Sequence, residues 1–309
     1  MAMHIPHTRR ALAVFTLVAA ALTATGCGSS TLDSGSGATT PTAATTSGGA
    51  AATATLDQAL AAKVPAAIKS KGTLIDGTDG SYAPNEYIGT DGKTMEGMDV
   101  DLLNAIATTL GLKVEYNNAQ FDTIILGVTG GKYDIAISSF TINAQRKQVV
   151  NMVQYFNAGT SWAAKAGTQI DPNNACGKSV SVQKGTVQVD DLAARSKACT
   201  KAGKPAINAV VETDQSKAAA DVISGKTDAM LADSPITAYA IKQSNGQMVA
   251  VGTIYDAAPY GIVVDKKQTA FAQVLSDALA ELKSNGVYDQ ILAKWGNSAG
   301  AVDSFPVNP

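Results

Sequence analysis

Two stretches of the chain share one layout. GKYDIAISS occupies residues 131–139, and GKTDAMLAD occupies residues 225–233. Each begins at a Gly-Lys pair, continues as an apolar run of strand length and ends on polar side chains, Ser139 in the first copy and Asp233 in the second. Open α/β sheets bind ligands beyond the carboxyl ends of their strands. The repeat therefore predicts two similar lobes that present polar groups to one cleft.

Helical and strand patterns alternate on both sides of the two copies. This alternation predicts an α/β fold with mostly parallel sheets flanked by helices, and residues 56–309 are long enough for two lobes. The expected helices cover residues 98–110, 122–128 (with Asp122 as the N-cap), 144–150, 187–197, 214–224, 234–243, 271–284 and 288–295; the expected strands cover 73–77, 113–116, 133–137, 178–182, 209–211, 227–231 and 260–264.

The N-terminus has the pattern of a secretory signal. Arg9 and Arg10 precede an apolar run at 11–22, which is shorter than the roughly 20 residues needed to cross a bilayer. Cys27 follows a small residue and resembles the lipidated cysteine of a bacterial lipobox; an ordinary signal peptide with an incidental cysteine is the alternative. We expect removal of residues 1–26 and anchoring of lipidated Cys27 to the outer face of the cell membrane. Residues 27–55 are rich in Gly, Ser, Thr and Ala and predict a flexible stalk.

Composition narrows the functional class. The only histidines, His4 and His7, lie in the segment to be removed, which excludes Ser-His and Cys-His nucleophiles and histidine metal sites from the mature chain. No metal or cofactor is expected, and an enzyme would depend on carboxylates, lysines or tyrosines. The net charge of −2 becomes −4 when Arg9 and Arg10 are lost. The remaining lysines are scattered, so no nucleic-acid partner is expected.

Two cysteines remain in the predicted mature body besides Cys27. In an oxidising compartment Cys176 and Cys199 are expected to form a disulfide. Two buried free thiols are the alternative interpretation.

Eight short segments, which follow one another along the chain in the order seen in a known protein family, carry a resemblance to that family. The chain resembles the polar amino-acid branch (family 3) of the bacterial extracellular solute-binding proteins that feed ABC importers. The resemblance implies the type II periplasmic-binding-protein fold, in which two doubly wound lobes are joined by two crossover strands. The first lobe would hold residues 56–158 plus 257–309, the second 162–253, and the crossovers would lie near 159–161 and 253–256. The segments are 77–84, 97–102, 121–122, 138–141 with Arg146 and Lys147, 182–186, 228–233, 259–262 and 294–295.

The same resemblance implies which residues would bind the amino-acid head of a ligand, that is, its α-carboxylate and α-ammonium groups. Arg146 would bind the α-carboxylate, because the guanidinium fork donates two parallel hydrogen bonds; without the resemblance, a surface arginine is the better interpretation. Asp233 would accept the α-ammonium, with helix N-capping as its alternative. The remaining contacts with the head would come from Ser138, Ser139, Thr141 and Thr186, for which capping is again an alternative.

The ligand side chain is assigned in the same way. Tyr82 and Phe121 would sandwich it, although Phe121 alone is also compatible with core packing. Asp79 would contact its distal end, which favours lysine, arginine or ornithine, with glutamine as the alternative and glutamate disfavoured. Glu86 would add a second negative charge or lie in a solvated loop. The sequence departs from the family pattern at Asn85 and at residues 152–155.

The expected function is capture of a polar amino acid by a monomer that closes around it and docks on an ABC permease. A subunit that presents the ligand to a membrane sensor would need the same pocket. A dehydratase of cyclohexadienyl acids on this fold would need Asp79 or Glu86 as a catalytic acid.

Overall fold

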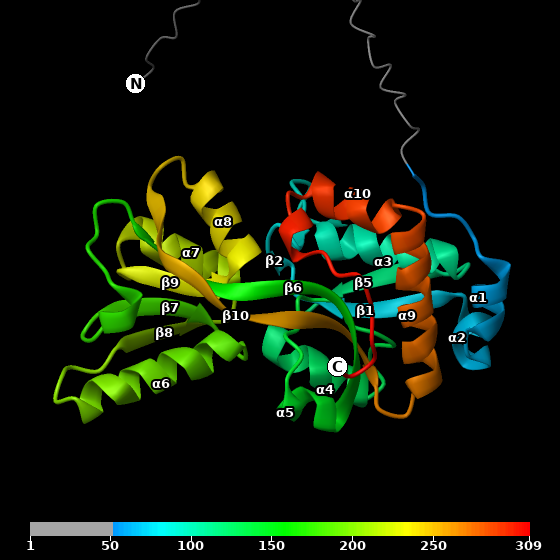
Figure 1. The fold of residues 1–309 in the computed structure, drawn as a ribbon, viewed down its shortest axis with the longest axis horizontal. Coiled ribbons are helices and arrows are strands. Elements are labelled where there is room, and N and C mark those ends of the chain that lie inside the picture. The colour runs from blue at the N-terminus through cyan, green and yellow to red at the C-terminus, as the bar shows by residue number, and fades with distance from the viewer. Residues whose placement is uncertain (1–51) are drawn as a thin grey trace, which may run out of the picture. The chain divides into compact units, whose positions relative to one another are not determined.

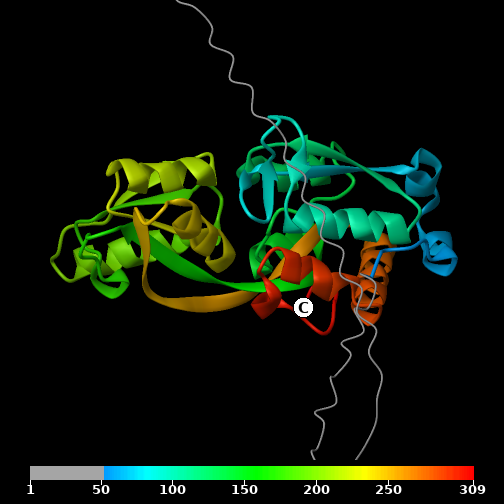
Figure 2. The same cartoon turned by 90° about the horizontal axis from the view of Figure 1, so that it is seen from above.

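Two long strands run through both lobes of the protein (Figures 1 and 2). The computed structural model describes residues 52–309, and the predicted signal segment, Cys27 and most of the predicted stalk lie outside the described residues. Strand β6 (Val150–Lys165) pairs antiparallel with β10 (Met248–Asp265). Their register shifts between Val251 and Tyr255 and again between Tyr255 and Ala258. The predicted crossovers, 159–161 and 253–256, lie within these two strands.

The first lobe is built from both ends of the described chain. Strand β1 (Thr73–Thr78) pairs in parallel with β5 (Lys113–Asn118), and β2 (Ser81–Tyr82), β3 (Glu86–Ile88) and β4 (Met95–Glu96) form a small antiparallel sheet. The helices of this lobe are α1 (Gln58–Lys63), α2 (Ala66–Lys71), α3 (Met98–Thr109), α4 (Phe121–Thr129), α5 (Ala144–Val149), α9 (Thr269–Ser284) and α10 (Val287–Lys294), followed by the 3-10 turn η2 (Ser298–Gly300).

The second lobe is a three-layer unit. Its sheet has the order β10-β6-β9-β7-β8, completed by β7 (Ser179–Gln183), β8 (Asn208–Glu212) and β9 (Ala229–Asp233). Helix α6 (Val187–Lys201) covers one face, and α7 (Gln215–Ser224) and α8 (Ser234–Gln243) cover the other (Figure 1). A 3-10 turn, η1 (Pro172–Asn174), precedes β7.

Side-chain alternation explains why helices cover both faces of each sheet. Along β9, Leu231 packs in the apolar cluster on the α6 side, whereas Met230 packs in the cluster on the side of α7 and α8. In the first lobe, Ile135 and Ile137 join the core formed with α3 and α9, whereas Ala136 joins the core formed with α4. Successive residues of an extended chain point to opposite faces, so these apolar runs are buried on both sides.

Two local predictions were wrong. Residues 133–137 do not form a regular strand, because only isolated bridges join Ile135 to Asp76 and Ala136 to Val263. Asp122 does not cap its helix, since α4 begins at Phe121 and its N-cap is Gln120. Asp122 instead lies in the first turn, where it pairs with Lys184 of the second lobe at 2.8 Å. Its carboxylate contributes to a contact between lobes that sequence periodicity does not encode.

The disulfide prediction is confirmed. Cys176 and Cys199 are bonded and join the segment before β7 to helix α6, in the second lobe. At the other end of the described chain, Ala52 and Ala54 pack against the first lobe, so the chain contacts its globular body from there on. Among residues 52–309, none of the helices combines the length and hydropathy that a bilayer crossing requires.

Candidate ligand-binding site

Polar side chains of the two lobes meet where the strands end. The Tyr82 hydroxyl donates to Asp233 Oδ2 at 2.7 Å, and Gln183 Nε2 donates to Asp79 Oδ2 at 2.8 Å. Each bond joins one residue of the first lobe to one of the second. Tyr82, Asp79 and Asp233 are all buried. The structure thus places the predicted residues Tyr82, Asp79 and Asp233 at the boundary between the lobes, where Gln183, which was not predicted, joins them.

Arg146 lies on α5 and reaches across to the second lobe. Its Nη1 donates to the Thr141 carbonyl at 2.8 Å, and its Nη2 donates to the Gly185 carbonyl at 3.1 Å. Burial lowers the pKa of Arg146 to about 10, opposed by the charge of Asp233, so the side chain is a cation at neutral pH. The side chain is half-buried, and its fork is bonded to backbone carbonyls of both lobes.

Two aromatic rings support the guanidinium. Phe121 and Phe140 stack with centroids 4.5 Å apart, and Arg146 Cζ lies 5.4 Å from each centroid. A cation over an aromatic face is stabilised by the ring quadrupole. Phe121 also packs in a core cluster of the first lobe, as the core-packing alternative expected, and its contact with a ligand stays a prediction. Phe140 was not among the predicted site residues, although its place between Ser139 and Thr141 pointed to it.

Asp233 is the acidic counterpart in the second lobe. It ends β9 and stands at the N-cap position of α8, but its side chain makes no capping hydrogen bond. Its Oδ1 instead accepts from Gln188 Nε2 at 2.7 Å. Burial raises the pKa of Asp233, and the positive charge of Arg146 is among the effects that lower it. The carboxylate is aimed into the site rather than along its own helix.

Gln188 is a site residue that sequence reasoning missed. It lies in the first turn of α6, is buried, and also donates to Thr160 Oγ1 at 3.2 Å. The available signal was its position two residues after Thr186, on a helix start expected to face the cleft. Thr186 itself is the N-cap of α6, yet its hydroxyl donates back to the Gln183 carbonyl at 2.8 Å and caps nothing.

The two serines of the first repeat rest on a pair of buried carboxyl groups. Ser138 Oγ donates to Glu86 Oε1 at 3.0 Å and accepts from the Asp79 amide at 3.0 Å. Ser139 adopts a left-handed backbone conformation with φ 52°, and its amide donates to Asp99 Oδ2 at 3.0 Å. Both serine hydroxyls form hydrogen bonds within the first lobe. These bonds fix the turn beneath the site.

Glu86 and Asp99 form a buried pair of carboxyl groups. Burial raises the pKa of Glu86 well above its ordinary range, with the charge of Asp99 as a further cause, and burial raises the pKa of Asp99 to about 6. Asp99 Oδ2 accepts from the Tyr155 hydroxyl at 2.6 Å in addition to the Ser139 amide. These donors favour an ionised Asp99, so we assign the proton to Glu86. Glu86 is fully buried, and the solvated-loop alternative does not apply to it.

Asn85, the predicted departure from the family pattern, has a structural role. It is buried, and its Nδ2 donates to Ser139 Oγ at 2.9 Å. Its Oδ1 accepts from Asn297 Nδ2 at 3.2 Å, which joins the serine turn to the C-terminal segment. The amide at this position thus forms a hydrogen-bonded link between two segments of the first lobe.

Asp79 is hydrogen-bonded on both oxygens. Oδ1 accepts from the Ser81 amide at 3.0 Å and its hydroxyl at 2.6 Å, while Oδ2 accepts from the Phe121 amide at 2.9 Å in addition to Gln183. Burial nevertheless raises the pKa of Asp79, against the effect of these hydrogen bonds. Its carboxylate fixes the start of α4 and one contact between the lobes.

Comparisons with known proteins agree with this geometry. The family model described as "Bacterial extracellular solute-binding proteins, family 3" matches residues 74–298. The arginine-binding protein ArgT of Corynebacterium glutamicum is 34% identical over 250 residues, which are 80% of this chain and 82% of ArgT.

Solved structures give the same family. An ancestral arginine-binding protein bound to arginine is 34% identical, with a TM-score of 0.66, over 72% of this chain and 98% of that chain. The structure titled "An ancestral arginine-binding protein bound to glutamine" is 32% identical, with a TM-score of 0.67, over 73% of this chain and 98% of that chain. With the family match spanning most of the described residues, the predicted fold is confirmed, and the chain belongs to the bacterial extracellular solute-binding proteins of family 3.

Proposed function

We propose that this protein captures a cationic amino acid, with arginine as the first candidate, and delivers it to the permease of an ABC importer. The observation that carries the proposal is one charged side chain of each sign on opposite lobes, each reaching across to the other lobe. Arg146 of the first lobe donates to the Gly185 carbonyl, and Asp233 of the second lobe accepts from the Tyr82 hydroxyl. A zwitterionic amino-acid head carries one carboxylate and one ammonium, so it complements this pair.

The two ends of the head would be held differently. The Arg146 fork would exchange its bonds to backbone carbonyls for two charge-assisted bonds to the α-carboxylate. Asp233 would exchange the Tyr82 hydroxyl for the α-ammonium while Gln188 keeps it oriented. Burying either charge alone is costly, and the ligand supplies the partner for each.

The identity of the side chain follows from weaker observations. The neighbourhood of Asp79, with Tyr82 and Phe121, is acidic and aromatic, which suits a guanidinium or ammonium. Two relatives carry arginine in their names, and a structure of one ancestral relative is bound to glutamine. Because both Asp79 oxygens already accept hydrogen bonds, this carboxylate does not require a cation. Glutamine is therefore the second candidate.

Binding would be coupled to closure of the lobes. Arg146 and Phe121 belong to one lobe, whereas Asp233, Gln188 and Thr186 belong to the other, so a ligand makes its full set of contacts only when the lobes approach. A ligand shifts such an equilibrium by its differential affinity for the two arrangements. The closed form is the one we expect a permease to recognise.

The cellular setting follows the same proposal. As a member of an extracellular family, the protein acts outside the cytoplasm. We propose that it does so as a monomer held to the outer face of the membrane by lipidated Cys27. Presentation of the ligand to a membrane sensor would use the same pocket and differ only in the partner.

We further propose that the protein has no catalytic activity. A dehydratase would need a carboxylic acid free to protonate a substrate. Glu86 lies beneath the two serines and accepts from the Ser138 and Ser139 hydroxyls, and Asp79 accepts from donors on both oxygens. Release of product from a cyclohexadienyl acid by the purified protein would contradict this proposal.

Isothermal titration of the purified protein with each of the twenty amino acids, ornithine and citrulline tests the assignment. We expect saturable binding of arginine, with lysine and ornithine competing for the same site. Binding of glutamine alone would retain the amino-acid class and overturn the cationic assignment. Failure of all of these to bind would overturn the proposed function.

A further inference from the structure

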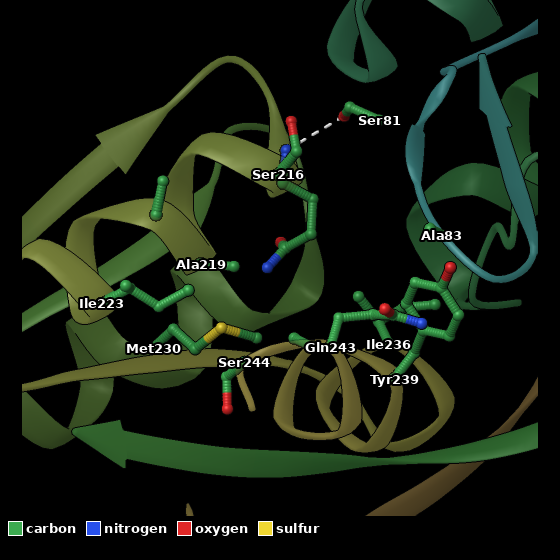
Figure 3. Close-up of a pocket in the computed structure, with 13 residues that line it drawn as sticks. Ser81, Ala83, Ser216, Ala219, Ile223, Met230, Ile236, Tyr239, Gln243 and Ser244 are labelled. Carbon is green, nitrogen blue, oxygen red and sulfur yellow. Dashed lines mark hydrogen bonds between the residues drawn. The ribbon is translucent and has the colours of Figure 1, made fainter. Parts of the chain in front are cut away.

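A cavity lies beside the candidate site and is distinct from it. It has a volume of about 230 Å³ and is walled mainly by α7 and α8 of the second lobe, with Ser81 and Ala83 of the first lobe at its side (Figure 3). Neither Arg146 nor Asp233 lines it. It borders the site through Tyr82, which packs in the same apolar cluster as Met230 and Ile236 of the cavity wall.

The wall combines apolar side chains with neutral polar ones, which come from Ser81, Gln215, Ser216, Tyr239, Gln243 and Ser244. Figure 3 shows Ile223, Met230 and Ile236 around the space, with Ala219 on α7. No lysine, arginine, aspartate or glutamate is among the lining residues. A space of this size holds about seven water-sized groups. A wall without charge favours a small neutral molecule over an ion.

One buried donor in this wall has no partner. Gln215 is the first residue of α7, is 2% exposed and lines the cavity. Its backbone amide donates to Ser81 Oγ at 3.0 Å, the bond drawn in Figure 3. Its side-chain Nε2 is buried and has no hydrogen-bond partner among the described residues. An unpartnered buried donor lowers the stability of the folded protein, and an acceptor placed in the cavity would remove that cost.

We propose that this cavity is a binding site for a small neutral molecule with a branched aliphatic or aromatic body and one acceptor oxygen, such as a ketone, ester or amide. The body packs against Ile223, Met230 and Ile236, and the oxygen accepts from Gln215 Nε2. A carboxylate is a poorer ligand, because no lining side chain carries a positive charge and Asp79 and Asp214 line the neighbouring pocket.

The site couples to the closure of the lobes. Ser81 and Ala83 belong to the first lobe and the rest of the wall to the second, so an occupant contacts both lobes only when they are close together. Such a molecule favours closure and tightens amino-acid binding, and linkage makes the effect reciprocal. This coupling rests on the proposed function, whereas occupancy of the cavity does not.

Methyl NMR tests occupancy directly. The protein is labelled with ¹³C at isoleucine and methionine methyls and titrated with 4-methylpentan-2-one, which has an acceptor oxygen and a branched apolar body. We expect saturating shifts of the Ile223, Met230 and Ile236 resonances. Ala219→Phe, which fills the cavity, should abolish them, whereas Ala270→Phe, on the exposed start of α9, should leave them unchanged.

Gln215→Met separates the hydrogen bond from the packing. Methionine is close in shape to glutamine but donates nothing, so the probe should bind about three- to tenfold more weakly. Equal affinity in this variant would overturn the role of Gln215. Absence of saturating shifts in the wild-type protein, or shifts that survive Ala219→Phe, would overturn the site, because the donor would then be satisfied by water alone.

The coupling has its own readout. Saturating 4-methylpentan-2-one should tighten arginine binding at least twofold in the wild-type protein and not in Ala219→Phe. Unchanged arginine affinity together with methyl shifts would retain the site and remove the coupling. Methyl shifts without any arginine binding would retain the site while the proposed function fails.

Discussion

The Tyr82 hydroxyl of one lobe donates to the Asp233 carboxylate of the other at 2.7 Å. This bond places an acceptor for an ammonium group directly against an aromatic wall. It also means that a ligand head competes with a tyrosine for the same oxygen. Selectivity for the ligand and closure of the lobes therefore depend on the same pair of side chains.

Arg146→Ala should weaken arginine binding at least about 100-fold, since it removes two charge-assisted hydrogen bonds of about 1.5–3 kcal/mol each. Isothermal titration measures the loss. Arg195→Ala is the matched control, because Arg195 is the other arginine of the described body and pairs with Asp191 on α6. Near-normal affinity in Arg146→Ala would exclude Arg146 as the carboxylate-binding residue.

Asp79→Asn should lower the affinity for arginine at least tenfold more than the affinity for glutamine. Asparagine retains one acceptor oxygen but removes the negative charge that favours a cation. The ratio of the two dissociation constants is the relevant quantity, because Asp79 also accepts from Ser81, Phe121 and Gln183. An equal loss for both ligands would show that Asp79 does not select between them.

Gly185→Ala should weaken arginine binding through a clash between the lobes. Gly185 has φ +80°, and an added Cβ would lie 2.7 Å from Asp122 Cβ of the opposite lobe. Gly203→Ala imposes a similar left-handed conformation, with φ +69°, but meets nothing within 4 Å. Both variants should lose stability, and only Gly185→Ala should lose affinity. Equal arginine affinities in the two variants would contradict the close approach.

The Glu86 and Asp99 pair should make stability depend on pH. Both folded-state pKa values are raised, so the folded protein binds more protons than the unfolded chain, and stability falls as pH rises. For Asp99 the window extends from 3.8 to about 6, and for Glu86 it extends upward from 4.5. Glu86→Gln removes one titrating group while keeping an acceptor for Ser138.

Differential scanning calorimetry at pH 5 and pH 8 measures this dependence. Glu86→Gln should melt close to the wild type at pH 5 and above it at pH 8. Glu115→Gln makes the same replacement at an exposed residue on β5 and should leave the pH dependence unchanged. Parallel curves for the wild type and Glu86→Gln would exclude a raised pKa of Glu86 as the cause of this pH dependence.

Replacing Cys176 and Cys199 together by alanine should cost about 3 kcal/mol of unfolding free energy, because the bond closes a loop with a sequence separation of 23. Urea titration measures this loss. Arginine affinity should change less than twofold, since neither cysteine is among the predicted contacts. A larger change in affinity would show that the disulfide positions the site.

Sequence reasoning located helices and strands that have a regular hydrophobic pattern, and it located the residues at their ends. Helix α8 occupies the predicted residues 234–243, and Asp233 directly precedes it. This boundary could be predicted because an apolar run ends there and a proline follows. The prediction of a strand at 133–137 was wrong, because an apolar run indicates burial but does not identify hydrogen-bond partners. Those partners, near Asp76 and Val263, come from distant parts of the chain.

The charged residues of the candidate site could be predicted from the sequence, whereas the hydrogen bonds that join its side chains could not. Arg146 and Asp233 stood out by rarity and by position. The engagement of Gln188 with Asp233, and of Ser139 with Asp99, depends on contacts between segments far apart in sequence. No local pattern encodes such contacts, because polar residues at helix starts usually cap their own backbone.

The interwoven first lobe has a consequence for the order in which the protein can fold. Its core joins Leu102 and Ile106 of α3 to Phe271 and Leu279 of α9, which lie more than a hundred residues later in the chain. A chain that emerges from a membrane N-terminus first cannot complete this core until its last segments have followed. The second lobe, whose β7, β8 and β9 lie between those segments, is the part that can assemble earliest.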